Sequence, residues 1–493
     1  MFTPIIGLEI HLQLKTKSKI FCSCSTSESE PNTNICPICL AYPGTMPNLN
    51  KEAVLQSIKM GLALNSKIAN KTNWDRKNYM YPDLFKGYQI SQLHEPICGE
   101  GNIEVLVRDR KNYYSKDNYK KIIGIFRAHL EEDTAKSIHG ENETLLDANK
   151  AGIPLLEIVS KPEMYSVDEA VSYAKTIRNL AKWFDISDCN LELGQMRFDA
   201  NISICVEDIE IKNKKYEEWK GIKFTPIVEI KNLNSFGNLQ SALDYEIKRQ
   251  IEEYQKSGEV YKAGNKETRG WDEEKQCTYI QRKKEEANEY RYIPEPDIPE
   301  LHIKDEEIVN IKSSLPKSPF EVAKELESIG IPSQAISLIT EEKIYYGIYS
   351  QIVEKNNSIA LRVANTLTNE LASEINQFEN LDVMKEWIEG LGNVFEALSK
   401  NDISSTEFKE ILKNHKNLES DWVELLSQIK NTEKVDVRSV LEKALAENPS
   451  IVEQIKNGKD SAKMFFVGIV MRETKGKANP EEVKKIIDEI IML

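Results

Sequence analysis

The chain has 493 residues, of which 40% are hydrophobic and 29% are charged, a composition typical of globular proteins. It contains 65 Lys and Arg residues and 79 Asp and Glu residues, so its formal net charge is −14. This charge excludes a protein that coats nucleic acid through a generally basic surface, although a local basic patch remains compatible with it. No apolar run is long enough to cross a bilayer and no secretory signal is apparent, so we expect a cytoplasmic protein. Its length predicts about three domains.

The segment PIIGLEIHLQLK at residues 4–15 predicts a half-buried strand. Read with a period of two, its apolar side chains fall on one side: Ile6, Leu8, Ile10, Leu12 and Leu14. The opposite side carries Glu9, His11 and Gln13. Strand neighbours of the same parity lie roughly 7 Å apart, so Glu9 and His11 are candidates to share one ligand.

A cysteine cluster follows in FCSCSTSESEPNTNICPICL. Its four thiols form a C-x-C pair and a C-x-x-C pair across a polar loop: Cys22, Cys24, Cys36 and Cys39. Two such pairs can surround one Zn²⁺ tetrahedrally, and four protein ligands would make that zinc structural. The alternative is four reduced structural thiols. We interpret the remaining cysteines, which are scattered singly, as ordinary buried thiols.

Three later segments repeat the alternation of apolar and polar residues, at residues 126–133, 196–205 and 228–231. In the first, His129 and Glu131 share a parity, whereas the second presents Asp199 and the third Glu229. Any one of these strands is equally typical of a solvated antiparallel sheet. If they share a sheet, their carboxylates converge on a site that must hold cations, because close like charges raise one another's pKa or recruit a metal. Mg²⁺ that bridges nucleotide phosphates is the natural occupant.

The character of the chain changes towards its C-terminal part. Residues 236–257 predict a long helix, capped by Asn234 or Ser235 and closed by Gly258. The prolines between Ile293 and Pro299 mark a boundary, beyond which nearly every segment reads as helix. We predict three domains, at residues 1–297, 298–400 and 401–493. The last of them carries a basic stretch from Lys456 to Lys477, whose alternative interpretation is a solvated helical face.

Several common motifs are absent from the sequence. It contains no G-x-x-x-x-G-K-[ST] loop and no G-x-G-x-x-G turn, so any nucleotide chemistry must use a site other than a P-loop or a Rossmann crevice. It also lacks a Gly/Ser-rich nucleophile loop of the amidase type.

The motifs resemble one known family along essentially the whole chain. GLEIHLQL, DRKNYMYPDLFKGYQISQ, HLEEDTAKSIH, AGIPLLEIVSKPEM, GQMRFDANISI, EIKNLNSFGNLQSALDYEIKRQ and YRYIPEPDIP are similar to the B subunit of the tRNA-dependent aspartyl/glutamyl amidotransferase. GKDSAKMFFVGIVMRETKGKANP resembles that protein's YqeY-like tail. The resemblance implies an α+β fold: an N-terminal antiparallel-sheet cradle related to glutamine synthetase, then an all-α helical domain, then the α-helical tail domain.

The resemblance also implies a function. The cradle would use ATP and Mg²⁺ to phosphorylate the side-chain carboxylate of Glu on tRNA-Gln or Asp on tRNA-Asn. Ammonia from the glutaminase A subunit would then displace the phosphate, with the small C subunit completing a heterotrimer. Lys475 and Lys477 in the tail would bind tRNA. The alternative is a non-catalytic, zinc-bearing, RNA-binding scaffold protein.

The residues that the resemblance implies for catalysis and Mg²⁺ binding are Glu9, His11, Glu132, Asp199 and Glu229. Strand parity and the resemblance disagree at one of them, because parity places Glu131, and not Glu132, beside His129. We follow the resemblance and expect Glu132, since a bulge or the end of the strand would reconcile the two.

Overall fold

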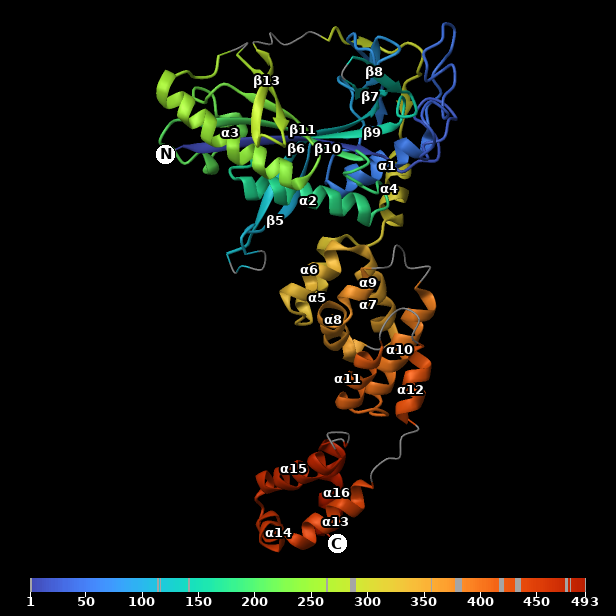
Figure 1. Cartoon of the computed structure of the whole chain (residues 1–493), viewed down its shortest axis with the longest axis vertical. Coiled ribbons are helices and arrows are strands. Elements are labelled where there is room, and N and C mark those ends of the chain that lie inside the picture. Colours follow the sequence, from blue (N-terminus) through green and yellow to red (C-terminus); the bar gives the residue numbers. More distant parts are fainter. Residues whose placement is uncertain are drawn as a thin grey trace. The chain divides into compact units, whose positions relative to one another are not determined.

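The computed structural model divides the chain into two compact units, Met1–Ser318 and Pro319–Leu493, which are described separately (Figure 1). The structure describes residues 2–112, 115, 117–140, 142–262, 265–283, 290–355, 357–376, 384–415, 421–430, 436–474, 478 and 480–492. The division lies beyond the predicted boundary at residue 297, because two elements after that residue belong to the first unit. Strand β15 (Leu301–His302) pairs with β2 (Lys71–Thr72), and helix α4 (Asp305–Ser314) contacts α1 (Lys51–Ala63). The predicted boundary at residue 400 stays a prediction.

An eight-stranded sheet forms the centre of the first unit, with the strand order β13-β12-β11-β10-β1-β9-β6-β5. The strands, in chain order, are β1 (Thr3–Gln13), β5 (Gly101–Val107), β6 (Tyr119–Glu132), β9 (Pro154–Ser160), β10 (Met196–Cys205), β11 (Val228–Leu233), β12 (Glu267–Asp272) and β13 (Cys277–Lys283). Neighbours pair antiparallel except β11 and β12, which are parallel. The predicted antiparallel sheet is therefore corrected to a mixed one, because helix α3 (Phe236–Ser257) carries the chain back across the sheet before β12 begins.

Helices cover the apolar face of this sheet. Helix α1 contacts β6, α2 (Val167–Trp183) contacts β1 and β5, and α3 contacts β10 and β11 (Figure 1). The residues of β1 that the alternation predicts to be apolar are buried, with Ile6, Ile10 and Leu12 at 0% exposure. The opposite face of the same strands therefore presents the polar residues.

Helix α3 begins and ends as its sequence predicts. The Ser235 side chain accepts a hydrogen bond from the Asn238 N–H group, and Gly258 closes the helix with a φ of 66°. Its buried side combines the apolar residues Leu239, Ala242 and Leu243 with the polar residues Glu246 and Gln250.

Three smaller sheets complete the first unit. One has the order β14-β3-β4, formed by β14 (Ile293–Pro294), β3 (Asp75–Asn78) and β4 (Tyr88–Ser91), and β4 contacts β6. A hairpin joins β7 (Lys136–His139) to β8 (Thr144–Asp147), and the third sheet is the β15–β2 pair. The β14-β3-β4 sheet thus lies beside the end of β6 that carries His129 and Glu131.

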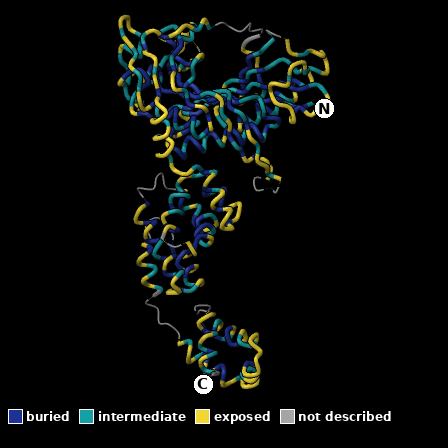
Figure 2. The backbone as a smooth tube through the Cα atoms, turned by 180° about the vertical axis from the view of Figure 1, so that it is seen from behind, coloured by how far each residue is buried: buried dark blue, intermediate teal, exposed yellow. Residues whose placement is uncertain are grey.

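The described residues of the second unit form helices only. They are α5 (Pro319–Ser328), α6 (Ser333–Glu341), α7 (Lys343–Lys355), α8 (Ala360–Asn369), α9 (Ala372–Ile375), α10 (Lys385–Ser399), α11 (Ser405–Asn414), α12 (Trp422–Lys430), α13 (Val437–Glu447), α14 (Pro449–Lys456), α15 (Lys463–Glu473) and α16 (Pro480–Met492). Helices α13, α15 and α16 bury a core of their own around Phe466 and Val483 (Figure 2). Across the described part of the chain, no helix has the length and apolar character needed to span a membrane.

Candidate functional site

Three carboxylates meet on the polar face of the large sheet: Glu9 of β1, Asp199 of β10 and Glu229 of β11. Glu9 lies opposite Asp199 in the β1–β10 register, and Glu229 lies opposite Asn201 in the β10–β11 register. One oxygen of each carboxylate lies within 4.8 Å of the others, close enough to share a cation. We call these three residues the acidic trio.

Two ammonium groups contact the acidic trio. Lys231 Nζ lies 3.0 Å from Asp199 Oδ2 and 2.8 Å from Glu229 Oε1. Lys266 Nζ lies 3.1 Å from the other oxygen of Glu229. Burial opposes ionisation of Glu229, but the two ammonium groups outweigh it and lower the pKa of Glu229 to about 2.

The environment of Glu9 disfavours its ionised form. Its Oε1 atom accepts a hydrogen bond of 2.9 Å from Asn201 Nδ2, which fixes its direction. Burial, followed by the nearby carboxylates of Glu157, Glu229 and Asp199, raises the pKa of Glu9. An added cation would relieve this repulsion, so the donor set of the acidic trio fits a hard divalent ion such as Mg²⁺.

A second group of ionisable side chains lies beside the acidic trio, and we call it the histidine–glutamate cluster: His11, His129, Glu131 and Glu157. Glu157 of β9 lies opposite His11 of β1 on one side and His129 of β6 on the other. Its Oε2 atom lies 3.3 Å from His11 Nε2 and 3.4 Å from His129 Nε2. Ser91 Oγ of β4 donates to Glu131 Oε2 at 3.1 Å.

Opposite charges balance within the histidine–glutamate cluster. Burial alone would lower the pKa of His129. The nearby carboxylates of Glu157 and Glu131 have the larger, opposite effect and raise this pKa to about 9. Burial in turn opposes ionisation of Glu157, whereas His129 and His11 hold its pKa well below the ordinary value. Although ligand atoms of His11, Glu131 and Glu157 lie close enough to share a metal, the opposite charges of the cluster already balance without one.

The structure brings Glu131 into this group and places Glu132 elsewhere. Glu132 Oε2 lies 2.5 Å from Lys86 Nζ, and its Oε1 atom accepts a hydrogen bond of 2.8 Å from the Ile90 N–H group. From Arg127 to Glu132, strand β6 pairs with β9 in a regular register, so no bulge turns the Glu132 side chain towards His11. The structure therefore places Glu131, and not Glu132, beside His11 and His129, as strand parity had indicated, and a role of Glu132 in Mg²⁺ binding stays a prediction.

Sequence reasoning missed two residues of the site. Glu157 lies in the otherwise apolar strand PLLEIVS, and a single carboxylate in such a strand was the available signal. Lys266 directly precedes β12, and a lysine in a loop gave no signal. Lys266 reaches the acidic trio only because β12 pairs in parallel with β11, where Glu229 lies opposite Thr268.

The predicted cysteine cluster forms. One sulfur of each of Cys22, Cys24, Cys36 and Cys39 lies within 4.8 Å of the others. Lys19 is fully buried, and its Nζ atom contacts Cys39 Sγ at 3.6 Å and the Ala148 carbonyl oxygen at 3.2 Å. Among the described residues no carboxylate forms an ion pair with Lys19, so the thiol group is where its counter-charge must lie. Hydrogen bonding from Cys22, with Lys19 nearby, lowers the pKa of Cys39, and the four sulfurs fit a bound metal ion such as Zn²⁺.

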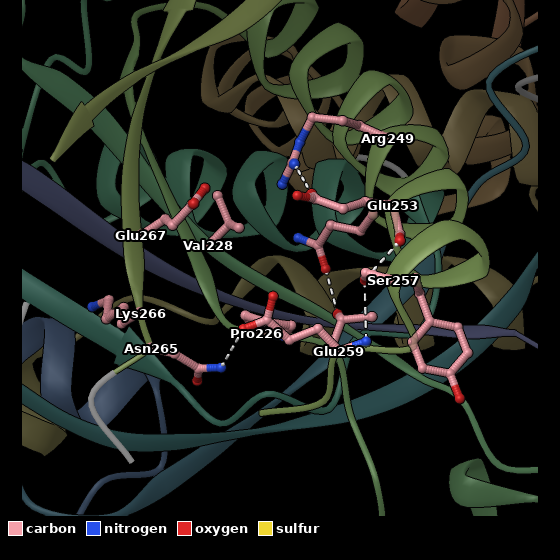
Figure 3. Close-up of a pocket in the computed structure, with 12 residues that line it drawn as sticks. Pro226, Val228, Arg249, Glu253, Ser257, Glu259, Asn265, Lys266 and Glu267 are labelled. Carbon is pink, nitrogen blue, oxygen red and sulfur yellow. Dashed lines mark hydrogen bonds and ion pairs between the residues drawn. The ribbon is translucent and has the colours of Figure 1, made fainter. Parts of the chain in front are cut away.

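A pocket of about 250 Å³ lies between the β11–β12 pair and helix α3 (Figure 3). Val228 and Glu267 line it from the two parallel strands, and Arg249 and Ser257 line it from α3. Lys266 also lines this pocket while its Nζ atom contacts Glu229. Lys266 thus reaches both the pocket and the acidic trio.

The structure does not describe the lysines of the tail that are predicted to bind tRNA. Lys475 and Lys477 lie outside the described residues, so their role in tRNA binding stays a prediction. Of their described basic neighbours, Lys463 pairs with Asp460 and Asp488, each at 2.6 Å.

Comparison with known proteins identifies the kind of fold and site. A family model described as the GatB/GatE catalytic domain matches residues 4–309, and a model described as the GatB domain matches residues 348–491. The first unit therefore holds a catalytic domain of the GatB/GatE class.

Curated relatives identify the family. The chain is 40% identical over 506 residues to the aspartyl/glutamyl-tRNA(Asn/Gln) amidotransferase B subunit of Crocosphaera subtropica, covering 99% of this chain and 98% of the relative. It is 39% identical over 496 residues to the B subunit of Finegoldia magna, with 99% of both chains covered. The chain belongs to the family of aspartyl/glutamyl-tRNA(Asn/Gln) amidotransferase B subunits. The curated names agree with the predicted amidotransferase and not with the alternative of a non-catalytic scaffold.

Proposed function

We propose that the chain catalyses the ATP-dependent activation of an aminoacyl-tRNA side-chain carboxylate. The γ-phosphoryl group of ATP is transferred to the carboxylate of Glu on tRNA-Gln or of Asp on tRNA-Asn, and ADP leaves. Ammonia then attacks the acylphosphate carbon, phosphate leaves, and the amide remains. The observation that carries this proposal is the convergence of the acidic trio from three strands onto one polar face.

Glu9, Asp199 and Glu229 are the residues that hold Mg²⁺ in this proposal. When bound, Mg²⁺ neutralises phosphate charge and orients the γ-phosphoryl group. Asn201 keeps the Glu9 carboxylate directed into the acidic trio through its hydrogen bond of 2.9 Å. His11, protonated beside Glu157 and Glu131, donates a hydrogen bond to a phosphate oxygen. Glu132 has no part in this proposal, because Lys86 and Ile90 engage its carboxylate.

A carboxylate needs little chemical help to attack a phosphoryl group. It is already ionised at neutral pH, so the protein contributes chiefly positioning and charge neutralisation. The acylphosphate that forms must then be kept from water until ammonia arrives. The relation of this cradle to glutamine synthetase remains a prediction about its ancestry, and no step depends on it.

The partners in this proposal are those that the family resemblance implies. The sequence lacks an amidase nucleophile loop, so ammonia comes from the glutaminase A subunit, with the small C subunit completing a heterotrimer. The C-terminal tail, with Lys475 and Lys477, binds the tRNA away from its acceptor end. Because tRNA is the substrate carrier, we place this activity in the cytoplasm.

The cysteine cluster has a separate role in the proposal. A zinc ion held by Cys22, Cys24, Cys36 and Cys39 would stabilise a polar loop that has little core of its own. Four protein sulfurs leave no open coordination position, so this zinc supports the fold and takes no part in phosphoryl transfer.

Amidation by the reconstituted heterotrimer tests the proposed function. With glutamine, ATP and Mg²⁺, the wild-type chain should convert Glu on tRNA-Gln or Asp on tRNA-Asn to the amide. Asp199→Asn should lower the rate at least about a hundredfold, because it removes charge from the acidic trio. Asp188→Asn is the matched control: its side chain is 57% exposed and pairs with Lys15 outside the trio, so activity should be unchanged. An active Asp199→Asn variant that folds normally would refute the assignment of the site.

A further inference from the structure

Lys231 occupies carboxylate oxygens that a metal ion would need. Its Nζ atom bridges Asp199 Oδ2 at 3.0 Å and Glu229 Oε1 at 2.8 Å, whereas Lys266 contacts Glu229 alone. An ammonium group and a divalent cation compete for the same oxygen lone pairs. Lys231 is therefore placed to neutralise the acidic trio when no metal is bound.

A β-bulge directs Lys231 into this position. Between the pairs Phe198↔Leu233 and Ala200↔Ile230, β11 contains one more residue than β10. Asn232, in the bulge, has a φ of 67°, a conformation that Asn tolerates better than most residues. Bulges redirect side chains and are common near active sites. Here the bulge lies opposite Asp199, so the chain departs from regular pairing where Lys231 contacts the acidic trio.

The Lys231 side chain has room to move. It remains 39% exposed, and its four-carbon stem can carry the ammonium group away from the carboxylates without any change in the backbone. Once released, the ammonium group lies on the open polar face, beside the carboxylates that would hold Mg²⁺. Phosphate oxygens that such a cation bridges would then lie within its reach.

We propose that Lys231 is an internal counter-ion that a divalent cation displaces from Asp199 and Glu229, and that its released ammonium group binds a phosphate oxygen of the nucleotide. This inference rests on the proposed function, since it requires metal and nucleotide at the acidic trio. Lys231 thereby couples the binding of the metal ion to the binding of the nucleotide. Its ammonium group neutralises Asp199 and Glu229 in the empty site and binds a phosphate oxygen in the loaded site.

Binding of Mn²⁺ and of ATP to the full-length chain tests the proposal without any measurement of activity. Free Mn²⁺ is measured by electron paramagnetic resonance, and Asp199→Asn identifies the binding that belongs to the acidic trio. Lys231→Met should tighten this Mn²⁺ binding about tenfold without nucleotide, because the competing charged hydrogen bonds are lost. The same variant should weaken ATP binding in the presence of Mn²⁺ about tenfold, and Lys231→Arg should restore most of the ATP affinity.

Lys266→Met is the matched control, because it removes the same charge from the trio without removing the bridge between two carboxylates. It should change Mn²⁺ affinity less than about threefold and ATP affinity less than Lys231→Met does. Equal tightening of Mn²⁺ binding by both variants would overturn the proposal, since the effect would then be one of charge alone. Unchanged Mn²⁺ or ATP affinity in Lys231→Met would overturn it too, while the proposed function would stand. If the wild-type chain bound no Mn²⁺ sensitive to Asp199→Asn, the proposed metal site would itself fail.

Discussion

Glu246→Gln should destabilise the first unit strongly, because Glu246 is the fully buried centre of a polar network beneath β12 and β13. Its carboxylate accepts hydrogen bonds from Arg249 Nε at 3.0 Å and from Thr278 Oγ1 at 2.9 Å. Arg269 Nε lies 3.8 Å from Glu246 Oε2 and donates to Thr278 Oγ1 at 2.8 Å. The network thus joins helix α3 to strands β12 and β13, next to the residues that contact Glu229.

The size of the effect follows from the burial of the partners. Gln keeps the volume and can still accept a hydrogen bond from Thr278, but it leaves Arg269 and Arg249 without the central negative charge. Breaking a buried ion pair costs about 3–5 kcal/mol, and Arg249 retains its exposed partner Glu253, so we expect about 3 kcal/mol. For a unit of this size that corresponds to a loss of roughly 4–5 °C in melting temperature.

Urea and thermal unfolding, followed by circular dichroism and tryptophan fluorescence, measure this loss. Trp271 of β12 is 5% exposed and lies close to Arg269, so it reports on the unfolding of this edge. The matched control is Glu253→Gln, which removes an exposed partner of the same Arg249 and should cost under about 1 kcal/mol. Equal stability losses in the two variants would refute the claim that the buried network holds β12 and β13 against α3.

Three further outcomes are expected. The purified reduced chain should contain about one zinc, and Cys36→Ser should lower that content sharply by metal analysis, whereas zinc-free wild-type protein would favour reduced thiols. Replacing Lys475 and Lys477 by Ala should weaken tRNA binding and reduce its salt slope by about 2, and unchanged binding would restore the interpretation of a solvated face. Because Lys231 and Lys266 outweigh burial and lower the pKa of Glu229 to about 2, this carboxylate stabilises the folded chain above pH 4.5, and that contribution is lost as the pH falls towards 2. Glu229→Gln should therefore flatten the acid-induced loss of stability over that range, and an unchanged slope would contradict the pairing.

The alternation of side chains in strands was the most informative feature of the sequence. It predicted the buried face of β1 and the shared polar face of Glu9, Asp199 and Glu229, because a period of two fixes the direction of each side chain. It also predicted Glu131 beside His129, where the resemblance to a family indicated Glu132. Local geometry was the better guide at this position.

Features that depend on the pairing of distant strands could not be predicted in the same way. The parallel pairing of β12 with β11, which brings Lys266 to Glu229, depends on how the chain returns after α3. Glu157 was missed because β9 is buried on both sides of its single carboxylate, so no alternation marks it. The burial of Glu246 and Gln250 in α3 could not be predicted either, because Arg249, Arg269 and Thr225, which satisfy them inside the fold, lie at positions that only the fold brings together.

Anomalous scattering from Mn²⁺ in crystals of the full-length chain tests the central claim most directly. A manganese peak bounded by the carboxylates of Glu9, Asp199 and Glu229, and lost in Asp199→Asn crystals, is the result that the proposed mechanism predicts. Manganese at other positions only, with Asp199 and Glu229 still bound to Lys231 and Lys266 at saturating Mn²⁺ and ATP, would contradict it.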